Sequence, residues 1–191
     1  MDCNICYVSV VGAGQIGWVV LIVRLPSEPS RHRVAVWREL RRVGAIQLGQ
    51  GSWALPAVPA YTEVATNIVG LVGRHEGEVL ALNAAGADAV TVDRIRALYD
   101  DARRAEWAEF ESECGKCVTE LQREIANQKF TLAELDEEEQ NVDRLRRWSR
   151  ELRVRDAFDA VPVDVTQTQL DECTAELDTF TALVYTAVGL G

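Results

Sequence analysis

The chain has 191 residues, of which 48% are hydrophobic and 26% are charged. This composition is enough to bury a sizeable core, and the length fits one domain or two small ones. Residues 1–92 are formally neutral, with seven basic and seven acidic side chains, so residues 93–191 carry the whole net charge of −10. An acidic protein is a poor bulk binder of nucleic acid, so any contact with DNA requires a local basic patch.

The first 17 residues are open to three interpretations. No charged residue occurs from Cys3 to Val23, a span long enough to cross a bilayer. Glycines and polar residues interrupt it, however, and no Lys or Arg precedes it, so we expect neither a signal peptide nor a membrane anchor. Residues 10–17 match the G-x-G-x-x-G outline of a dinucleotide-binding turn, but Pro26 would end the required helix too early. We interpret residues 1–17 as a flexible N-terminal extension.

Residues 18–84 carry the pattern strand, helix, strand, strand, helix, strand. The run from Trp18 to Leu25 is bulky and mostly β-branched, and it stops at Pro26. A helix follows, with Ser30 as its expected N-cap and Gly44 at its end. The predicted elements after it are a hairpin of strands 45–48 and 52–55 around a glycine turn, a helix at 60–74 and a strand at 78–83.

The order βαββαβ predicts a ferredoxin-like α+β sandwich with both helices on one face of the sheet. Apolar residues alternate on both sides of the first strand, with Trp18, Val20 and Ile22 on one side. Two helices cover only one face. We therefore expect the other face to meet a second protomer, giving a homodimer, or the helical half of the same chain.

After a short hinge, residues 88–191 are predicted to form an antiparallel helical region of three long helices. Thr91 is the expected N-cap of the first helix, and Thr131 with Glu134 forms a capping box for the second. Pro162 separates the second helix from the third. Each helix carries an apolar stripe at steps of three and four residues, and such stripes bury one another in a bundle.

Two blocks of sequence resemble the N-terminal domain of the chromate-resistance protein ChrB. The first comprises WxxLxxxLP, RxxxWRxLRxxGA, a glycine turn and WxLP, between residues 18 and 56. The second comprises KFT at 129–131, AELDEEEQNVDRLRRW at 133–148 and RDAF at 155–158, and it resembles the helical half of the actinobacterial form of that domain. Together the blocks cover most of residues 18–188. More distantly, the chain is similar to the central domain of PaaX-type repressors and, through them, to ferredoxin-like CRISPR-associated nucleases.

The resemblance implies a cytoplasmic regulatory or sensing component of the chromate response, with chromate or DNA as its partner. ChrB proteins often carry a further C-terminal domain, which we do not expect within these 191 residues. The related nucleases hold a metal with an acidic residue at the end of the first strand, where this chain has Arg24-Leu25-Pro26. The two histidines, His32 and His75, lie in no motif with a nucleophile. We therefore expect no enzymatic activity and no cofactor.

The cysteines provide an alternative from another functional class. Cys3-x-x-Cys6 and Cys114-x-x-Cys117 both have metal-ligand spacing, so a zinc site or a redox dithiol is conceivable. The second pair lies on an apolar helical stripe, where buried thiols are ordinary core residues, and Cys173 is left over. We favour reduced thiols without a metal.

The sharper candidates for a binding site are the arginines around the first helix: Arg24, Arg31, Arg33 and Arg38. Arg24 lies at the end of the first strand, and Arg33 falls within the apolar arc of the helix. An arginine in apolar surroundings requires an anionic partner. Guanidinium groups suit tetrahedral oxyanions, so chromate, sulfate or a DNA phosphate is a fitting ligand. An internal salt bridge, to Glu63 or to a carboxylate of the helical half, is the simpler alternative.

Overall fold

The computed structural model describes residues 17–190. The predictions for the N-terminal extension, the glycine-rich turn and the pair Cys3 and Cys6 lie outside the described residues. The chain divides into two compact units, one up to Tyr99 and one from Asp100 onward. The division falls inside a long helix, so the first turns of that helix belong to the unit that contains the sheet.

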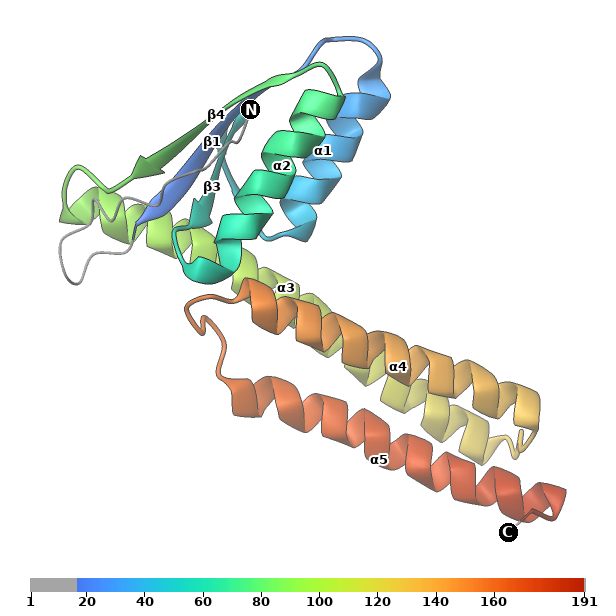
Figure 1. Ribbon diagram of the computed structural model, residues 1–191. Helices are drawn as coiled ribbons and strands as arrows, with labels where there is room; N and C mark the ends of the chain where they lie inside the picture. Colours follow the sequence, from blue (N-terminus) through green and yellow to red (C-terminus); the bar gives the residue numbers. More distant parts are fainter. Residues whose placement is uncertain (1–16, 191) are drawn as a thin grey trace. The chain divides into compact units, whose positions relative to one another are not determined.

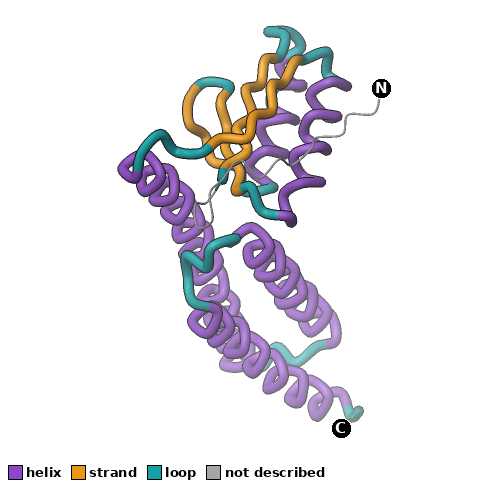
Figure 2. The backbone as a smooth tube through the Cα atoms, turned by 60° about the vertical axis from the view of Figure 1, so that its left-hand side comes forward, coloured by secondary structure: helices purple, strands orange, loops and turns teal. Residues whose placement is uncertain are grey.

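The first unit, here called the sheet unit, is an α+β structure. Its elements are β1 (Trp18–Arg24), α1 (Ser30–Arg42), β2 (Ile46–Gly49), β3 (Ser52–Pro56), a 3₁₀ turn (Pro59–Tyr61), α2 (Thr62–Arg74) and β4 (Glu78–Ala84). The four strands form one sheet in the order β2-β3-β1-β4, and every neighbouring pair is antiparallel. Figures 1 and 2 show α1 and α2 side by side on the same face of this sheet.

Glycines end α1 and shape the hairpin as the sequence indicated. Gly44 has a φ of 82°, and its N–H donates to the carbonyl oxygen of Arg41, which closes the last turn of the helix. The predicted N-cap was wrong. Ser30 is the first residue of α1 itself, and Pro29 precedes it without any side-chain cap. Pro29 has extended backbone angles and is the N-cap, so the helix begins one residue earlier than the preference for serine at the N-cap predicted.

The two faces of β1 differ in their cover. On the helix side Val19 and Leu21 are buried beneath the apolar stripes of α1 and α2. On the other side Trp18 packs edge-on against Tyr99, with ring centroids 5.7 Å apart. Farther along that side, Leu80 and Leu82 of β4 are 58% and 48% exposed. The second face is therefore covered only in part.

The second unit, here called the helical unit, contains three long helices. They are α3 (Ala89–Ala126), of which the part from Asp100 belongs here, α4 (Leu132–Arg155) and α5 (Val163–Val188). Figure 1 shows each of them running antiparallel to the next along the chain, as expected for an antiparallel helical region. Their core contains Phe110, Leu121, Val142, Leu145, Phe180 and Val184, each fully buried.

One of the two predicted caps in this region is confirmed. The Thr131 hydroxyl accepts a hydrogen bond from the Glu134 N–H at 3.2 Å and starts α4. The cap predicted at Thr91 was wrong, because α3 begins two residues earlier. Asp88 takes that role, and its carboxylate accepts from the Thr91 N–H at 2.7 Å. Between residues 17 and 190, no helix is both long and apolar enough to cross a membrane.

Candidate functional site

A pocket in the sheet unit brings two of the predicted arginines together. It has a volume of about 470 Å³ and lies between α1, the end of β1 and the β2–β3 turn. Arg24 and Arg33 line it, with two tryptophans and two glutamines. The remaining lining consists of Val23, Leu25, Val36, Leu40 and Gly51. We call this site the arginine pocket.

Arg33 is exposed on α1, although helical periodicity places it within the apolar arc of that helix. Its Nη1 donates to the carbonyl oxygen of Ser27 at 2.6 Å, so the chain before α1 holds the side chain in position. The simpler alternative, an ion pair with Glu63, is not formed. Within residues 17–190, neither Arg24 nor Arg33 forms an ion pair with a carboxylate.

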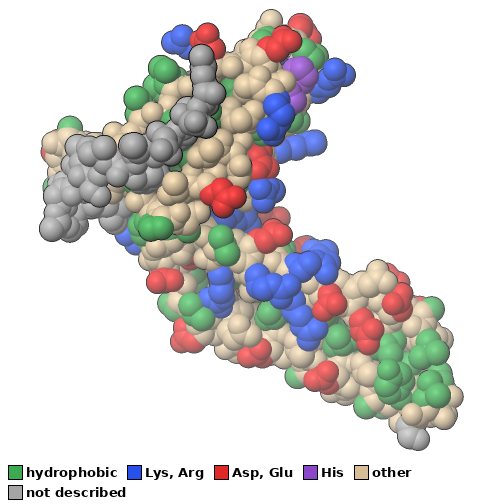
Figure 3. All heavy atoms as spheres, in the orientation of Figure 1, with side chains coloured by type: hydrophobic (Ala, Val, Ile, Leu, Met, Phe, Trp, Pro, Cys, Tyr) green, Lys and Arg blue, Asp and Glu red, His purple; other side chains and the backbone are tan. Residues whose placement is uncertain are grey.

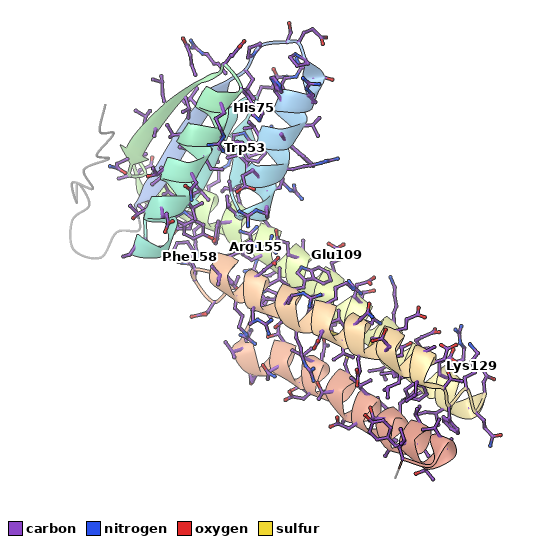
Figure 4. The ribbon with its side chains drawn as sticks, turned by 45° about the vertical axis from the view of Figure 1, so that its right-hand side comes forward. Trp53, His75, Glu109, Lys129, Arg155 and Phe158 are labelled. Atoms are coloured by element: carbon purple, nitrogen blue, oxygen red, sulfur yellow. The ribbon has the colours of Figure 1, made fainter. Side chains whose placement is uncertain are left out.

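The other polar groups of the pocket were not identified from the sequence. Gln47 and Gln50 come from the hairpin, and the Gln47 amide donates to the Gly49 carbonyl at 3.2 Å. Trp53, labelled in Figure 4, is buried between the sheet and the helices. Trp37 belongs to the apolar arc of α1, yet it is 49% exposed and forms one side of the pocket. Indole and amide N–H groups are donors, and no acidic side chain lines the pocket among the described residues, so the site suits an anion.

Arg31 and Arg38 do not contribute to the arginine pocket. Both are exposed on α1, outside the lining. Arg41 stacks over the Trp37 ring at 5.6 Å. Arg42 pairs with Glu39 at 2.6 Å, and the hydrogen bond from Arg42 lowers the pKa of Glu39. The structure thus separates the four predicted arginines into two that line a pocket and two on an open helical surface.

The two histidines of the chain meet, which the sequence did not indicate. His32 at the start of α1 stacks on His75 at the end of α2, with ring centroids 4.3 Å apart. Figure 4 shows His75 at that helix end. Among the described residues, no group of three or more His, Cys, Asp or Glu side chains has the arrangement of a metal site.

The cysteines of the helical unit are buried. Cys114 and Cys117 belong to its core, as their place on the apolar stripe predicted. Cys173 lies beside them, although it comes from α5. The alternative of a zinc site would combine Cys114 and Cys117 with Cys3 and Cys6. Cys3 and Cys6 lie outside the described part of the chain.

The residues at 129–131 have structural roles. Lys129, labelled in Figure 4, contacts the buried carboxylate of Glu124 with Nζ 3.0 Å from Oε2. The hydrogen bond with Glu124 raises the pKa of Lys129. Phe130 packs against Phe180 at a centroid distance of 6.2 Å, and Thr131 caps α4. These three residues therefore fix the turn between α3 and α4.

Asp156 organises the opposite end of the helical unit. Its carboxylate accepts hydrogen bonds from Trp107 Nε1 at 3.1 Å, from the Ala160 N–H at 2.9 Å and from the Val161 N–H at 3.4 Å. Asp156 is only 7% exposed. It therefore joins the end of α4, the loop before α5 and the side of α3. Its neighbours Arg155 and Phe158 are labelled in Figure 4.

Glu138 is a buried carboxylate within the apolar stripe of α4, and its titration predicts a pH effect. It is 5% exposed, and its Oε2 has no hydrogen-bond partner among the described residues. Burial raises the pKa of Glu138 above its ordinary value of 4.5. The folded state therefore binds this proton more tightly than the unfolded state does. The contribution of Glu138 to stability is greatest at a pH below 4.5, and it falls as the pH rises through the raised pKa of the folded state.

We expect the substitution Glu138→Gln to raise the melting temperature at pH 7.5 by a few degrees, because it removes a buried charge. The gain should shrink towards pH 4, where the wild-type side chain is protonated. Thermal unfolding followed by circular dichroism at both pH values measures it. Glu137→Gln, at an exposed neighbouring position, is the matched control. A gain that is equal in both variants, or independent of pH, would contradict the prediction.

Comparison with known proteins identifies the family. The profile described as "Protein ChrB, N-terminal" matches residues 33–190. The chain is also 28% identical over 125 residues to Protein ChrB of Cupriavidus metallidurans strain CH34. That alignment covers 65% of this chain but 35% of the relative, so the chain spans about a third of the relative's length. No solved structure matches the chain. Since the family profile matches residues 33–190, well over half of the chain, the chain belongs to the ChrB N-terminal family.

Proposed function

We propose that this protein is a cytoplasmic regulatory component of the chromate response and that its sheet unit binds the chromate dianion in the arginine pocket. Membership of the ChrB N-terminal family supports the link to chromate. The observation that carries the proposal is the convergence of Arg24 and Arg33 on one pocket without a carboxylate partner in the described residues. Two guanidinium groups beside an apolar wall favour a compact dianion.

We further propose that the sheet unit is a ferredoxin-like sandwich. The element order βαββαβ, the strand order β2-β3-β1-β4 and the antiparallel pairing support this assignment. In this arrangement β1 is a central strand, so its end carries Arg24 towards the hairpin turn. The arginine pocket then follows from the topology, because α1 begins a few residues after β1 and places Arg33 nearby.

The pocket also sets the expected selectivity. Arg24, Arg33 and the indole and amide groups recognise the charge and the oxygen atoms of a ligand, which chromate shares with sulfate and molybdate. We therefore propose competition among tetrahedral dianions rather than absolute selection of chromate.

Contact with DNA would use a different surface. Arg31 and Arg38 are exposed on α1 and form the local basic patch that an acidic protein requires. The arginines of α4 are less suitable, because Arg146 pairs with Asp143 at 3.0 Å and Arg144 lies 3.7 Å from Glu113. Figure 3 shows basic and acidic side chains interspersed along this face of the helical unit. The anion and DNA roles can therefore be separated by substitutions on one helix.

The test is isothermal titration calorimetry of the full chain with chromate, sulfate and molybdate. We expect Arg33→Ala to weaken binding by roughly 10- to 100-fold, because a charged hydrogen bond contributes about 1.5–3 kcal/mol. Arg38→Ala removes the same charge from the same helix without touching the pocket, so its affinity should stay within about twofold. Molybdate does not oxidise thiols, and it therefore separates the heat of binding from the heat of oxidation.

Two results would overturn the proposal. In the first, none of the three anions binds the wild-type protein. In the second, Arg33→Ala and Arg38→Ala weaken binding equally, which would indicate attraction by the general field of the arginines rather than a site.

A further inference from the structure

Three of the five cysteines meet in the core of the helical unit, although they come from two helices. Cys114 and Cys117 lie one turn apart on α3, and Cys173 lies on α5. The exposed fractions of the three side chains are 2%, 2% and 0%. The Sγ of Cys173 donates to the carbonyl oxygen of Cys114 at 3.4 Å, and all three cysteines belong to one buried cluster.

The two α3 thiols differ in how readily they lose a proton. The hydrogen bond from Cys173 stabilises the thiolate of Cys114 and lowers the pKa of Cys114. The pKa of Cys117 is raised by its own hydrogen bond with Cys173, by burial and by the nearby charge of Glu138. The thiolate is the nucleophilic form of cysteine. Of the two α3 cysteines, Cys114 is therefore the better nucleophile, and its carbonyl oxygen already contacts the Cys173 thiol.

We propose that Cys114 and Cys173 form a disulfide bond between α3 and α5 when the protein meets a two-electron oxidant of the peroxide class. The Cys114 thiolate attacks one peroxide oxygen, the O–O bond breaks, and the departing hydroxide takes up a proton to become water. Cys114 is then a sulfenic acid. The Cys173 thiol loses its proton and its sulfur bonds to that of Cys114, which releases a second water as the S–O bond breaks. Two thiols lose two electrons, and one hydrogen peroxide becomes two waters.

The bond would join two helices whose cysteines are 59 residues apart in sequence. Closing so long a loop constrains the unfolded chain, so the oxidised protein should melt at a higher temperature than the reduced protein. Because the three thiols are buried, the oxidant reaches them only when the helices separate locally. Oxidation should therefore be slow, and sub-denaturing urea should accelerate it.

A tryptic map under non-reducing conditions tests the pairing directly. Cleavage after Arg104, Lys116 and Arg155 places Cys114, Cys117 and Cys173 in three different peptides. Folded full-length protein is treated with hydrogen peroxide, its remaining thiols are alkylated, and it is then digested. We expect a linked pair of peptides 105–116 and 156–191 that dithiothreitol separates, together with the loss of two titratable thiols.

Single variants assign the roles. Cys117→Ser should still form the linked pair, whereas Cys114→Ser and Cys173→Ser should not, with circular dichroism confirming that each variant is folded. The wild-type map decides the matter even if a variant fails to fold. A link that contains peptide 117–123 would overturn the proposal, and so would a folded protein that keeps all its thiols under conditions that oxidise the urea-unfolded chain.

Discussion

Replacing Asp156 with alanine is expected to lower the free energy of unfolding of the helical unit by about 3 kcal/mol. The carboxylate accepts from Trp107 Nε1 and from the backbone N–H groups of Ala160 and Val161. Alanine would leave these donors without their partner, and Trp107 is only 3% exposed. The cost of unpaired buried donors exceeds the modest net value of the bonds themselves. Urea denaturation followed by far-ultraviolet circular dichroism measures the change.

Two control variants separate this effect from a general loss of charge. Asp156→Asn keeps a carbonyl acceptor but loses the second acceptor and the charge, so it should cost less than alanine. Asp171→Ala removes an exposed carboxylate from α5 and should change stability by less than about 0.5 kcal/mol. If Asp156→Ala and Asp171→Ala had the same stability, the three hydrogen bonds would not be what joins the loop to α3.

Features with a local cause were predictable from the sequence. Gly44 ends α1 because a left-handed residue closes a helix, and Thr131 starts α4 because its hydroxyl lies three residues before the donor. The hairpin between β2 and β3 was likewise predicted from its local glycines, Gly49 and Gly51. Of the two caps that failed, Thr91 gives way to Asp88, whose carboxylate accepts from the Thr91 N–H, whereas α1 begins at Ser30 after Pro29 without a side-chain cap.

Features that join distant parts of the chain were not predictable. Asp156 and Trp107 are 49 residues apart, and no local pattern pairs them. Cys173 was left over in the sequence because only the packing of α5 on α3 brings it to Cys114. The two histidines are likewise distant in sequence and stacked in space. Such contacts depend on tertiary packing. A periodic pattern predicts which face of a helix is buried, but it does not predict which other helix packs against that face.

The arginine pocket was predictable only in part from the sequence. Helical periodicity placed Arg33 in the apolar arc of α1, and the end of the strand placed Arg24 nearby. The structure leaves Arg31 and Arg38, which lie on the opposite arc of that helix, outside the pocket lining. Trp37 lies in the apolar arc of α1, yet the structure leaves it 49% exposed beside the pocket.

Replacing Gly51 with alanine is expected to destabilise the sheet unit by about 3 kcal/mol and to weaken anion binding in the arginine pocket about tenfold. Gly51 has a φ of 72°, and a Cβ atom there would lie 2.7 Å from the carbonyl oxygen of Val23. The Gly51 carbonyl also accepts from the Val23 N–H at 2.7 Å, so any shift of the turn disturbs the link between β1 and the hairpin. Both residues line the pocket, next to Arg24.

Gly49→Ala is the matched control, because it adds the same methyl group to the same turn. A Cβ at Gly49 meets no atom within 4 Å, and its φ lies outside the left-handed region. We expect Gly49→Ala to leave both properties close to wild type, as measured by urea denaturation and by calorimetry with molybdate. If Gly51→Ala destabilised the unit but bound molybdate normally, the hairpin would support the fold without shaping the pocket. Equal effects of the two substitutions would mean that the turn tolerates no side chain at all, and the specific contact with Val23 would not be the cause.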